Sequence, residues 1–277
     1  MSLWHKRFWK GKTAMVKLGL TLERAWNRFY VTRVAPRHEK AFPIEAPDVI
    51  HYLFYPKKKS RILVVVLQAF HPEGTRYNYV STLSKVNANR LYIKDDFTPQ
   101  TGSFYLGRNG TYNIEAGVHR LIRKFADQCK AEKLIFVGSS KGGAAAVSFG
   151  ISYPNAVMIV AAPMYHLGTY MYETKKFNPA LEDAVGAPVT PEKISELNDR
   201  VPAKVRSDPY GKTQRAYIHC SVNDKTFQKH VIDMMADMER AGVTVVLDKA
   251  DYEGHETLKY YFPDFLKKSI AKETGQA

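Results

Sequence analysis

Apolar runs and amphipathic helical patterns alternate along most of the chain. Continuous runs of branched and aromatic residues predict strands that are buried on both faces of a parallel sheet. Apolar residues that recur every three or four positions predict helices. The predicted strands are 49–55, 62–67, 91–93, 134–138, 156–161, 215–220 and 243–247, and the predicted helices are 113–130, 141–153, 227–241 and 258–268. This alternation is typical of an α/β fold with a doubly wound, mostly parallel sheet.

Two segments depart from the alternation. Residues 163–214 lie between two predicted strands, are mixed in polarity and contain prolines, and an insertion of this length usually covers a functional site as a cap. The N-terminal segment has its own basic, helical pattern. We therefore predict a helical extension over 1–45 and an α/β domain over 46–277, with a cap insertion at about 164–214.

One face of the predicted N-terminal helix is apolar and the adjacent face is basic. Either the helix packs on the edge of the domain with its basic side in solvent, or it lies at a membrane interface, which favours tryptophan and basic residues. The apolar face comprises Met15, Leu18, Leu22, Ala25 and Phe29, and the three tryptophans of the chain, Trp4, Trp9 and Trp26, lie in the same segment.

Composition narrows the class of partner and the compartment. With 41 basic and 27 acidic residues among 277, the net charge is +14, which favours an anionic partner such as nucleic acid, a phospholipid surface or an acidic molecule or polymer. No nucleic-acid recognition motif accompanies the charge, so we do not expect a nucleic-acid partner.

Cys129 and Cys220 are too few for a disulfide framework or a metal site, and they indicate a reducing compartment. Without a secretory signal or a long apolar window, we expect a cytoplasmic protein, and contact with the inner membrane face is a further hypothesis.

The segment with the clearest chemistry joins a predicted strand to a predicted helix. The apolar run over 134–138 leads into Gly138-Ser-Ser-Lys-Gly142, which fits G-x-S-x-G, and an Ala/Gly-rich helical pattern follows. This is the context of a nucleophile elbow, where a strained turn lifts a serine out of the backbone and needs glycine on both sides. Ser140 is therefore the predicted nucleophile, and the alternative is a serine-rich turn without chemistry. A phosphate-binding loop is disfavoured because the lysine precedes the glycine pair.

A serine nucleophile needs a histidine base and a carboxylate that orients it, in the chain order Ser, Asp/Glu, His for an α/β-hydrolase. His255 follows the last predicted strand and precedes the last predicted helix. The other histidines precede the elbow, lie inside a predicted strand or helix, or lie near strand ends in the wrong position for the base. Asp224, which follows strand 215–220, is the preferred acid, and Asp248 and Asp251 are the alternatives.

Acyl transfer also needs two backbone amides that stabilise the oxyanion. One is predicted to be the amide of Lys141, the residue after the nucleophile. The other is predicted in the loop after strand 62–67, at Ala69 or Phe70. The side chain of Lys141 is not needed for this role, and it either holds an anionic group or solvates the start of the helix.

The full elbow, Gly138-Ser-Ser-Lys-Gly-Gly143, resembles that of bacterial capsular polysaccharide O-acetyltransferases of α/β-hydrolase fold, and of the related acyltransferase of accessory Sec systems. The separations of Ser140, Asp224 and His255 also look like those of the family's triad. The resemblance extends from about Arg61 to Phe265. Further segments that resemble the family are Phe70-His-Pro with Tyr77-Asn-Tyr79, Gly102-Ser-Phe-Tyr105, and Ser152-Tyr-Pro-Asn155 followed by Ala161-Ala-Pro163.

The resemblance implies an α/β-hydrolase fold and a serine-dependent O-acyltransferase. The donor would be acetyl-CoA, as a co-substrate rather than a bound cofactor, and the acceptor a capsular or other surface polysaccharide, with no metal involved. We expect His71 and His166, near predicted strand ends, and Tyr105 to contact substrate. Two alternatives stay open: a serine esterase with the same triad, and a non-catalytic subunit of a glycan-assembly machine. Peripheral contact with such machinery is a further hypothesis.

Overall fold

The computed structural model describes residues 25–26, 29–45, 48–71, 76–98, 101–207 and 213–276. Most of the predicted N-terminal helix, with Trp4 and Trp9, lies outside the described residues. At its described end, Trp26 and Phe29 are 59% and 51% exposed, and their ring centroids lie 5.8 Å apart. The two interpretations of this helix therefore stay predictions.

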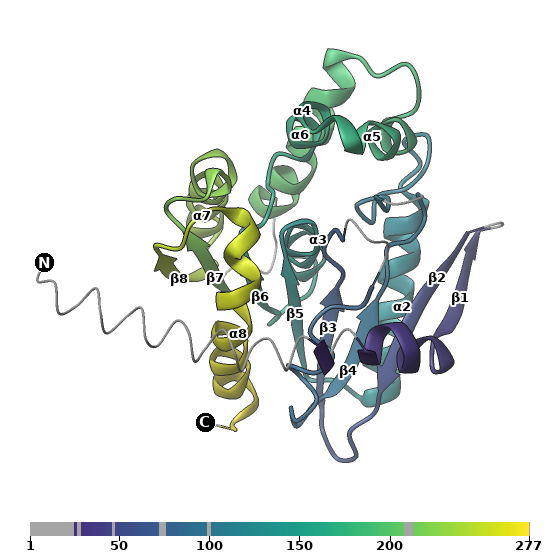
Figure 1. Cartoon of the computed structure of the whole chain (residues 1–277), viewed down its shortest axis with the longest axis vertical. Helices are drawn as coiled ribbons and strands as arrows, with labels where there is room; N and C mark the ends of the chain where they lie inside the picture. Colours follow the sequence, from purple (N-terminus) through teal and green to yellow (C-terminus); the bar gives the residue numbers. More distant parts are fainter. Residues whose placement is uncertain are drawn as a thin grey trace, which may run out of the picture.

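An eight-stranded sheet in the order β1-β2-β4-β3-β5-β6-β7-β8 forms the centre of the molecule (Figure 1). From β4 to β8 along this order neighbouring strands are parallel, whereas β2 is antiparallel to both β1 and β4. The strands are β1 (Lys40–Glu45), β2 (Asp48–Tyr55), β3 (Ile62–Leu67), β4 (Asn89–Ile93), β5 (Lys133–Ser139), β6 (Val157–Ala161), β7 (Arg215–Ser221) and β8 (Thr244–Ala250). The predicted doubly wound, mostly parallel α/β sheet is confirmed.

Strand β1 is absent from the sequence prediction, and it corrects the predicted domain boundary. It pairs antiparallel with β2, with Lys40 opposite Tyr52, so the sheet already begins within the segment assigned to the N-terminal extension. Its sequence, KAFPIE, contains a proline and is largely exposed. An edge strand tolerates a proline because one of its sides has no neighbouring strand to which a backbone amide must donate. The α/β domain therefore starts before residue 46, at the latest with Lys40.

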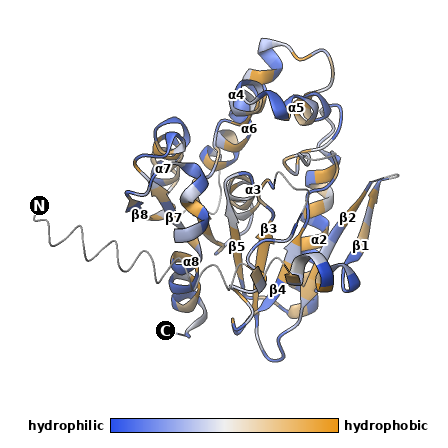
Figure 2. Ribbon diagram, in the orientation of Figure 1, coloured by the Kyte–Doolittle hydropathy of each residue, from blue (hydrophilic) through white to orange (hydrophobic). Residues whose placement is uncertain are grey.

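Helices cover both faces of the sheet, and its central strands β3, β5 and β6 are strongly apolar (Figure 2). Alternating residues of β5 show the two faces: Gly138 packs against Gly142 of α3, whereas Ser139 bonds to Tyr79, whose ring packs on Phe262 of α8. Among the described residues outside the insertion, the α-helices that pack on the sheet are α2 (Asn113–Cys129), α3 (Lys141–Gly150), α7 (Ile232–Arg240), which continues a π-helical turn at Phe227–Val231, and α8 (Leu258–Thr274). A π-helical turn (Tyr30–Val34) and a 3₁₀ turn (Ala35–Arg37) precede β1.

The insertion between β6 and β7 lies over the ends of the strands (Figure 1). It contains α4 (Leu167–Glu173), a 3₁₀ turn (Lys175–Phe177), α5 (Asn178–Val185) and α6 (Pro191–Arg206). Its position agrees with the predicted cap, whose function stays a prediction.

Polar contacts attach the insertion to the α/β domain at several places, and two of them involve α5 and α6. In α5, Asp183 accepts a hydrogen bond of 2.7 Å from Thr98 Oγ1. In α6, Lys204 Nζ and Arg200 Nη2 donate to the Glu115 carboxylate of α2, at 2.6 and 2.8 Å. Burial would raise the pKa of Glu115, but the two cations outweigh it and hold the pKa below its ordinary value.

Glu115→Gln tests the second attachment. Because the folded-state pKa of Glu115 is depressed, its contribution is complete above the pKa of an unfolded glutamate and is lost as pH falls through the folded value. We expect the variant to lose about 3 kcal/mol of unfolding free energy at pH 7, since two cations lose their partner. Denaturant unfolding at a series of pH values should show the difference from wild type shrinking below about pH 4. A difference independent of pH would contradict this assignment.

Candidate active site

The predicted elbow is built by a close approach between the end of β5 and the start of α3. Ser140 joins them with φ 53° and ψ −122°, a conformation that side-chain-bearing residues rarely adopt. A Cβ on Gly138 would collide with the carbonyl group of Gly142, and a Cβ on Gly142 would collide with the carbonyl oxygen of Leu67 in β3. Both glycines are therefore required by the geometry. They hold Ser140 at the C-terminal ends of the central strands.

Three loops at this edge bring Ser140, His255 and Asp224 together. His255 Nε2 lies 3.0 Å from Ser140 Oγ, and His255 Nδ1 lies 2.7 Å from Asp224 Oδ2. An ionised carboxylate can only accept, so Nδ1 carries the proton and Nε2 is left as an acceptor for the serine hydroxyl. This is the geometry in which an imidazole can remove a proton from a serine.

Asp224 is well suited to orient the imidazole because it is buried but hydrogen-bonded. It is 2% exposed, and its Oδ1 accepts a hydrogen bond of 2.8 Å from the amide of Thr226. Burial would raise the pKa of Asp224, but the bonds from His255 and Thr226 outweigh it and hold the pKa below its usual value. The acid is therefore charged at neutral pH.

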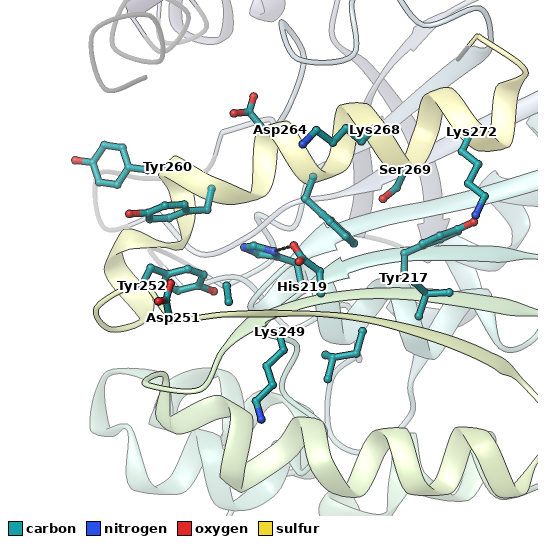
Figure 3. Close-up of a pocket in the computed structure, with 16 residues that line it drawn as sticks. Tyr217, His219, Lys249, Asp251, Tyr252, Tyr260, Asp264, Lys268, Ser269 and Lys272 are labelled. Carbon is teal, nitrogen blue, oxygen red and sulfur yellow. Dashed lines mark hydrogen bonds and ion pairs between the residues drawn. The ribbon is translucent and has the colours of Figure 1, made fainter. Parts of the chain in front are cut away.

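The two alternative acids lie elsewhere. Asp248 accepts a hydrogen bond of 2.7 Å from Nδ1 of His219, which is buried in β7. His219 and the exposed Asp251 line a separate cavity of about 780 Å³ between β8 and α8 (Figure 3). Within the described ranges, Asp224 is the carboxylate that contacts His255.

The predicted oxyanion donors lie on the two sides of the elbow. Lys141 is the first residue of α3, where backbone amides have no partner within the helix. The amide of Ala69 already donates to Asn78 Oδ1 at 2.9 Å, which leaves Phe70 as the better second donor of the two alternatives. Both assignments stay predictions.

Tyr105 corrects a prediction of substrate contact. It is 1% exposed, and its hydroxyl donates to the carbonyl of Ile93 and accepts from the amide of Gln68, at 3.0 and 2.5 Å. A side chain enclosed in this way cannot reach a substrate, so Tyr105 supports the loop after β3.

The other two predicted substrate contacts are partly exposed. His71 Nε2 accepts from Asn78 Nδ2 at 3.0 Å, beside the predicted oxyanion loop. His166 lines a cavity of about 430 Å³ between α4 and the loop after β7, together with Tyr170, Thr226 and Lys229. Thr226 Oγ1 lies 3.4 Å from His255 Nδ1, so this cavity borders the triad. Substrate contact by His71 and His166 stays a prediction.

Sequence reasoning missed two neighbours of the elbow. Met164, just after β6, places its sulfur 3.5 Å from Ser140 Oγ. The side chain of Lys141 is 2% exposed and bonds to Asp95. Both roles predicted for it, holding an external anion or solvating the start of the helix, are therefore wrong. A charged residue directly after the nucleophile in an otherwise small, apolar helix pattern was the available signal.

Two further kinds of feature are absent from the described residues. They contain no group of three or more His, Cys, Asp or Glu side chains arranged to hold a metal ion. Among the helices that could be assessed, none is both long and apolar enough to cross a bilayer.

Comparison with known proteins shows a shared fold at low sequence identity. No family model and no curated protein matches the sequence. Among solved structures, the capsule O-acetyltransferase of Neisseria meningitidis serogroup A superimposes with a TM-score of 0.68 at 18% identity, over 83% of this chain and 93% of that one. A single-residue variant of that enzyme has been solved in complex with CoA, with a TM-score of 0.67.

Two further structures extend the comparison. The Glycosylation Associate Protein complex of Streptococcus agalactiae superimposes with a TM-score of 0.68 at 15% identity, over 86% of this chain and 47% of that one. An S-formylglutathione hydrolase of Agrobacterium tumefaciens has a TM-score of 0.57 at 15% identity, over 86% and 95% of the two chains. The predicted resemblance is thus confirmed as structural similarity, and the α/β-hydrolase fold is confirmed with it.

Asp224→Asn and Asp248→Asn distinguish the two acids. We expect Asp224→Asn to lower kcat for hydrolysis of p-nitrophenyl acetate by about 10⁴-fold, because an amide no longer fixes the imidazole tautomer. Asp248→Asn changes the partner of His219 only, so kcat should stay within about 3-fold of wild type. Steady-state kinetics on folded, thermally characterised variants measures both. A larger loss in Asp248→Asn than in Asp224→Asn would contradict the assignment.

Proposed function

We propose that this chain is a serine-dependent O-acyltransferase that moves an acetyl group from acetyl-CoA to a hydroxyl of a bacterial capsular or other surface polysaccharide. The observation that carries the proposal is the continuous hydrogen-bonded chain from Ser140 through His255 to Asp224 at a nucleophile elbow. The proposed roles are Ser140 as nucleophile, His255 as general base and acid, and Asp224 as the orienting carboxylate.

In the first half-reaction, Ser140 Oγ attacks the thioester carbonyl while His255 Nε2 takes its proton. The amides of Lys141 and Phe70 are proposed to stabilise the oxyanion of the tetrahedral intermediate, an interaction worth about 3 kcal/mol for each donor. Collapse of the intermediate breaks the carbon–sulfur bond. The CoA thiol leaves with the proton from His255, and an acetyl-serine remains.

In the second half-reaction, an acceptor hydroxyl replaces the thiol. His255 takes the proton from this hydroxyl, whose oxygen attacks the acetyl-serine through the same oxyanion site. Collapse returns the proton to Ser140 and releases the acetylated acceptor. Water competes for the same intermediate, so transfer requires a site that excludes it. The insertion with α4, α5 and α6 is our candidate for that shield.

Similarity and charge support the choice of donor and acceptor. One structural neighbour is a capsule O-acetyltransferase, and a variant of it has been solved with CoA. The net charge of +14 would favour both the phosphates of CoA and an acidic polysaccharide.

The proposed setting is the cytoplasm, close to the machinery that assembles the glycan. Cys129 and Cys220 are free thiols, which suits a reducing compartment. A neighbour from a glycosylation-associated complex supports the hypothesis of partner proteins. The hypothesis of contact with such partners or with the inner membrane face rests on the basic composition of the N-terminal segment.

Ester hydrolysis is the second candidate, because structural neighbours include a hydrolase and the same triad serves both reactions. The two differ only in whether water or a sugar hydroxyl accepts the acetyl group.

Intact-protein mass spectrometry after mixing with acetyl-CoA tests the proposal. Wild type should gain one acetyl group, and Ser140→Ala should gain none because it lacks the nucleophile. Adding an acidic capsular polysaccharide should then move the label to the glycan and speed the release of CoA. Equal release of acetate with and without polysaccharides, and no acetylated glycan, would favour the esterase. No acetyl-enzyme at all, with Ser140→Ala still functional in cells, would favour a non-catalytic subunit.

A further inference from the structure

The side chain of Lys141, the residue after the nucleophile, is buried, and its ammonium group is hydrogen-bonded. Its Nζ lies 2.8 Å from Asp95 Oδ2 and 3.3 Å from the carbonyl oxygen of Thr101. The ammonium also lies 5.8 and 5.7 Å from the ring centroids of Phe104 and Tyr105. Lys141 is 2% exposed and Asp95 is fully buried, so this ion pair is closed to solvent and to ligands.

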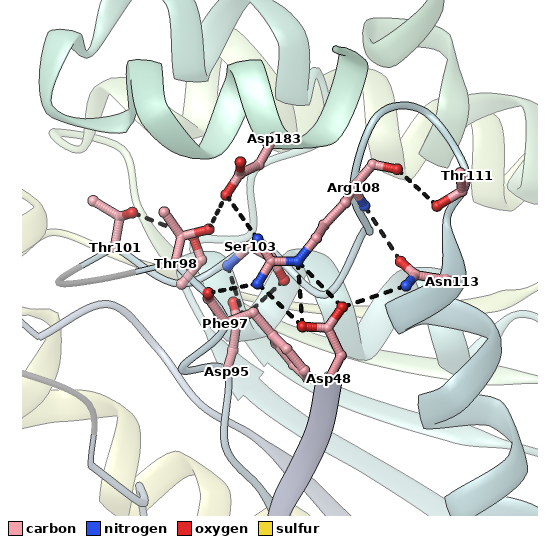
Figure 4. A network of polar contacts seen from close by, with 11 residues as sticks. Asp48, Asp95, Phe97, Thr98, Thr101, Ser103, Arg108, Thr111, Asn113 and Asp183 are labelled. Carbon is pink, nitrogen blue, oxygen red and sulfur yellow. Dashed lines mark hydrogen bonds and ion pairs between the residues drawn. The ribbon is translucent and has the colours of Figure 1, made fainter. Parts of the chain in front are cut away.

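Asp95, just after β4, collects bonds from the segment that follows it. Its Oδ1 accepts from the amide of Ser103 at 2.7 Å and from the Ser103 hydroxyl at 2.9 Å (Figure 4). Gly102 has φ 71°, and a Cβ there would lie 2.6 Å from both Asp95 Oδ2 and Lys141 Nζ. Phe104 and Tyr105 also have positive φ values, which non-glycine residues rarely adopt. The ion pair thus packs directly against an unusual backbone conformation at 102–105. Only a glycine at position 102 leaves room for this contact.

The same carboxylate residue is tied to the loop after β3. The amide of Asp95 donates to Gln68 Oε1 at 2.8 Å, and the amide of Gln68 donates to the Tyr105 hydroxyl at 2.5 Å. Gln68 is 2% exposed and directly precedes Ala69 and Phe70. One buried network therefore holds Lys141 on one side of the elbow and the residues before Phe70 on the other.

We propose that the Lys141–Asp95 pair is the positioning unit of the oxyanion hole, which sets the amides of Lys141 and Phe70 at their working separation. The inference rests on the proposed function, and it assigns positioning roles to Asp95, Gln68 and Ser103 in addition to the triad. Oxyanion donors act only when they lie about 3 Å from the developing charge and are held within about 0.5 Å of that position. A buried ion pair is a poor source of net stability, because desolvation offsets its attraction, but it fixes geometry tightly.

The test compares a neutralised pair with a matched pair far from the site. Lys141→Met with Asp95→Asn removes both charges and leaves no uncompensated buried ion, while the asparagine can still accept from Ser103. Lys133→Met with Glu273→Gln is the control, since that pair lies where β5 begins and α8 ends and also includes a buried carboxylate. Glu273 also accepts from Arg215 and Tyr217, so this control disturbs more buried contacts than a simple pair and reports any general effect of stability. Both double variants are labelled with a fluorophosphonate, whose phosphoryl oxygen occupies the oxyanion site when Ser140 attacks.

Two readouts separate positioning from folding. The fraction of protein labelled at completion reports how many sites are folded, and the second-order rate constant reports how well each site works. We expect the Lys141/Asp95 variant to keep its labelled fraction and to lose about 100-fold in rate constant. The control should label at the wild-type rate, and Ser103→Ala, which keeps the ion pair, should lose less than about 10-fold.

The possible failures are distinct. A wild-type rate constant in the Lys141/Asp95 variant, or a loss confined to the labelled fraction, would overturn the inference and leave the proposed nucleophile intact. Equal slowing of the control would likewise show a general effect of stability. A wild-type enzyme that is not labelled at Ser140 would overturn the proposed nucleophile, and the inference with it.

Discussion

The site depends on two backbones that approach too closely for side chains. At Gly138 and Gly142, strand β5 and helix α3 meet without room for a Cβ, and Ser140 takes the strained turn between them. Such strain persists only where the surroundings over-determine it. Here the central parallel strands on one side and the buried Lys141–Asp95 pair on the other supply that constraint. The close approach thus fixes the position from which Ser140 meets His255.

Most of the sheet could be predicted from the sequence because its strands are apolar on both sides. Ile62–Leu67 is an unbroken apolar run, as expected for a strand buried on both faces. The structure gives this strand the same first and last residues as the prediction. Lys40–Glu45 was not predicted, because this exposed edge strand contains a proline. It has neither a continuous apolar run nor a clear alternation of apolar and polar residues, the two patterns that indicate a strand. The long helix after β8 extends to Thr274, six residues beyond the prediction. Its last turns bury Ser269, Ile270 and Glu273, and two polar residues among these three leave no apolar pattern to read.

The catalytic triad could be predicted because the order of its residues along the chain places them on neighbouring loops. The roles of Tyr105 and Asp95 could not, because they depend on burial and on contacts that are distant in sequence. Ser140, Asp224 and His255 each follow a strand of one parallel sheet, so topology alone brings their loops to one edge. Tyr105 appeared to be a substrate contact because sequence does not reveal that its hydroxyl is enclosed by Gln68 and Ile93. Asp95 drew no attention because its partners are far away in sequence, and a lone aspartate after a strand usually faces solvent.

The cap is inserted between two neighbouring strands, β6 and β7, and this position determines which parts of the protein can vary in length and sequence. β6 and β7 are neighbouring parallel strands with Val157 opposite Arg215, so the insertion leaves the sheet at the C-terminal end of β6 and returns along it to the start of β7. Doubling the length of such a loop raises its closure entropy cost by only about 0.6 kcal/mol. The elbow and the network around Asp95 lie outside it. Caps of other lengths and sequences could therefore be grafted between these two strands, and the acceptor changed, without altering the machinery beneath.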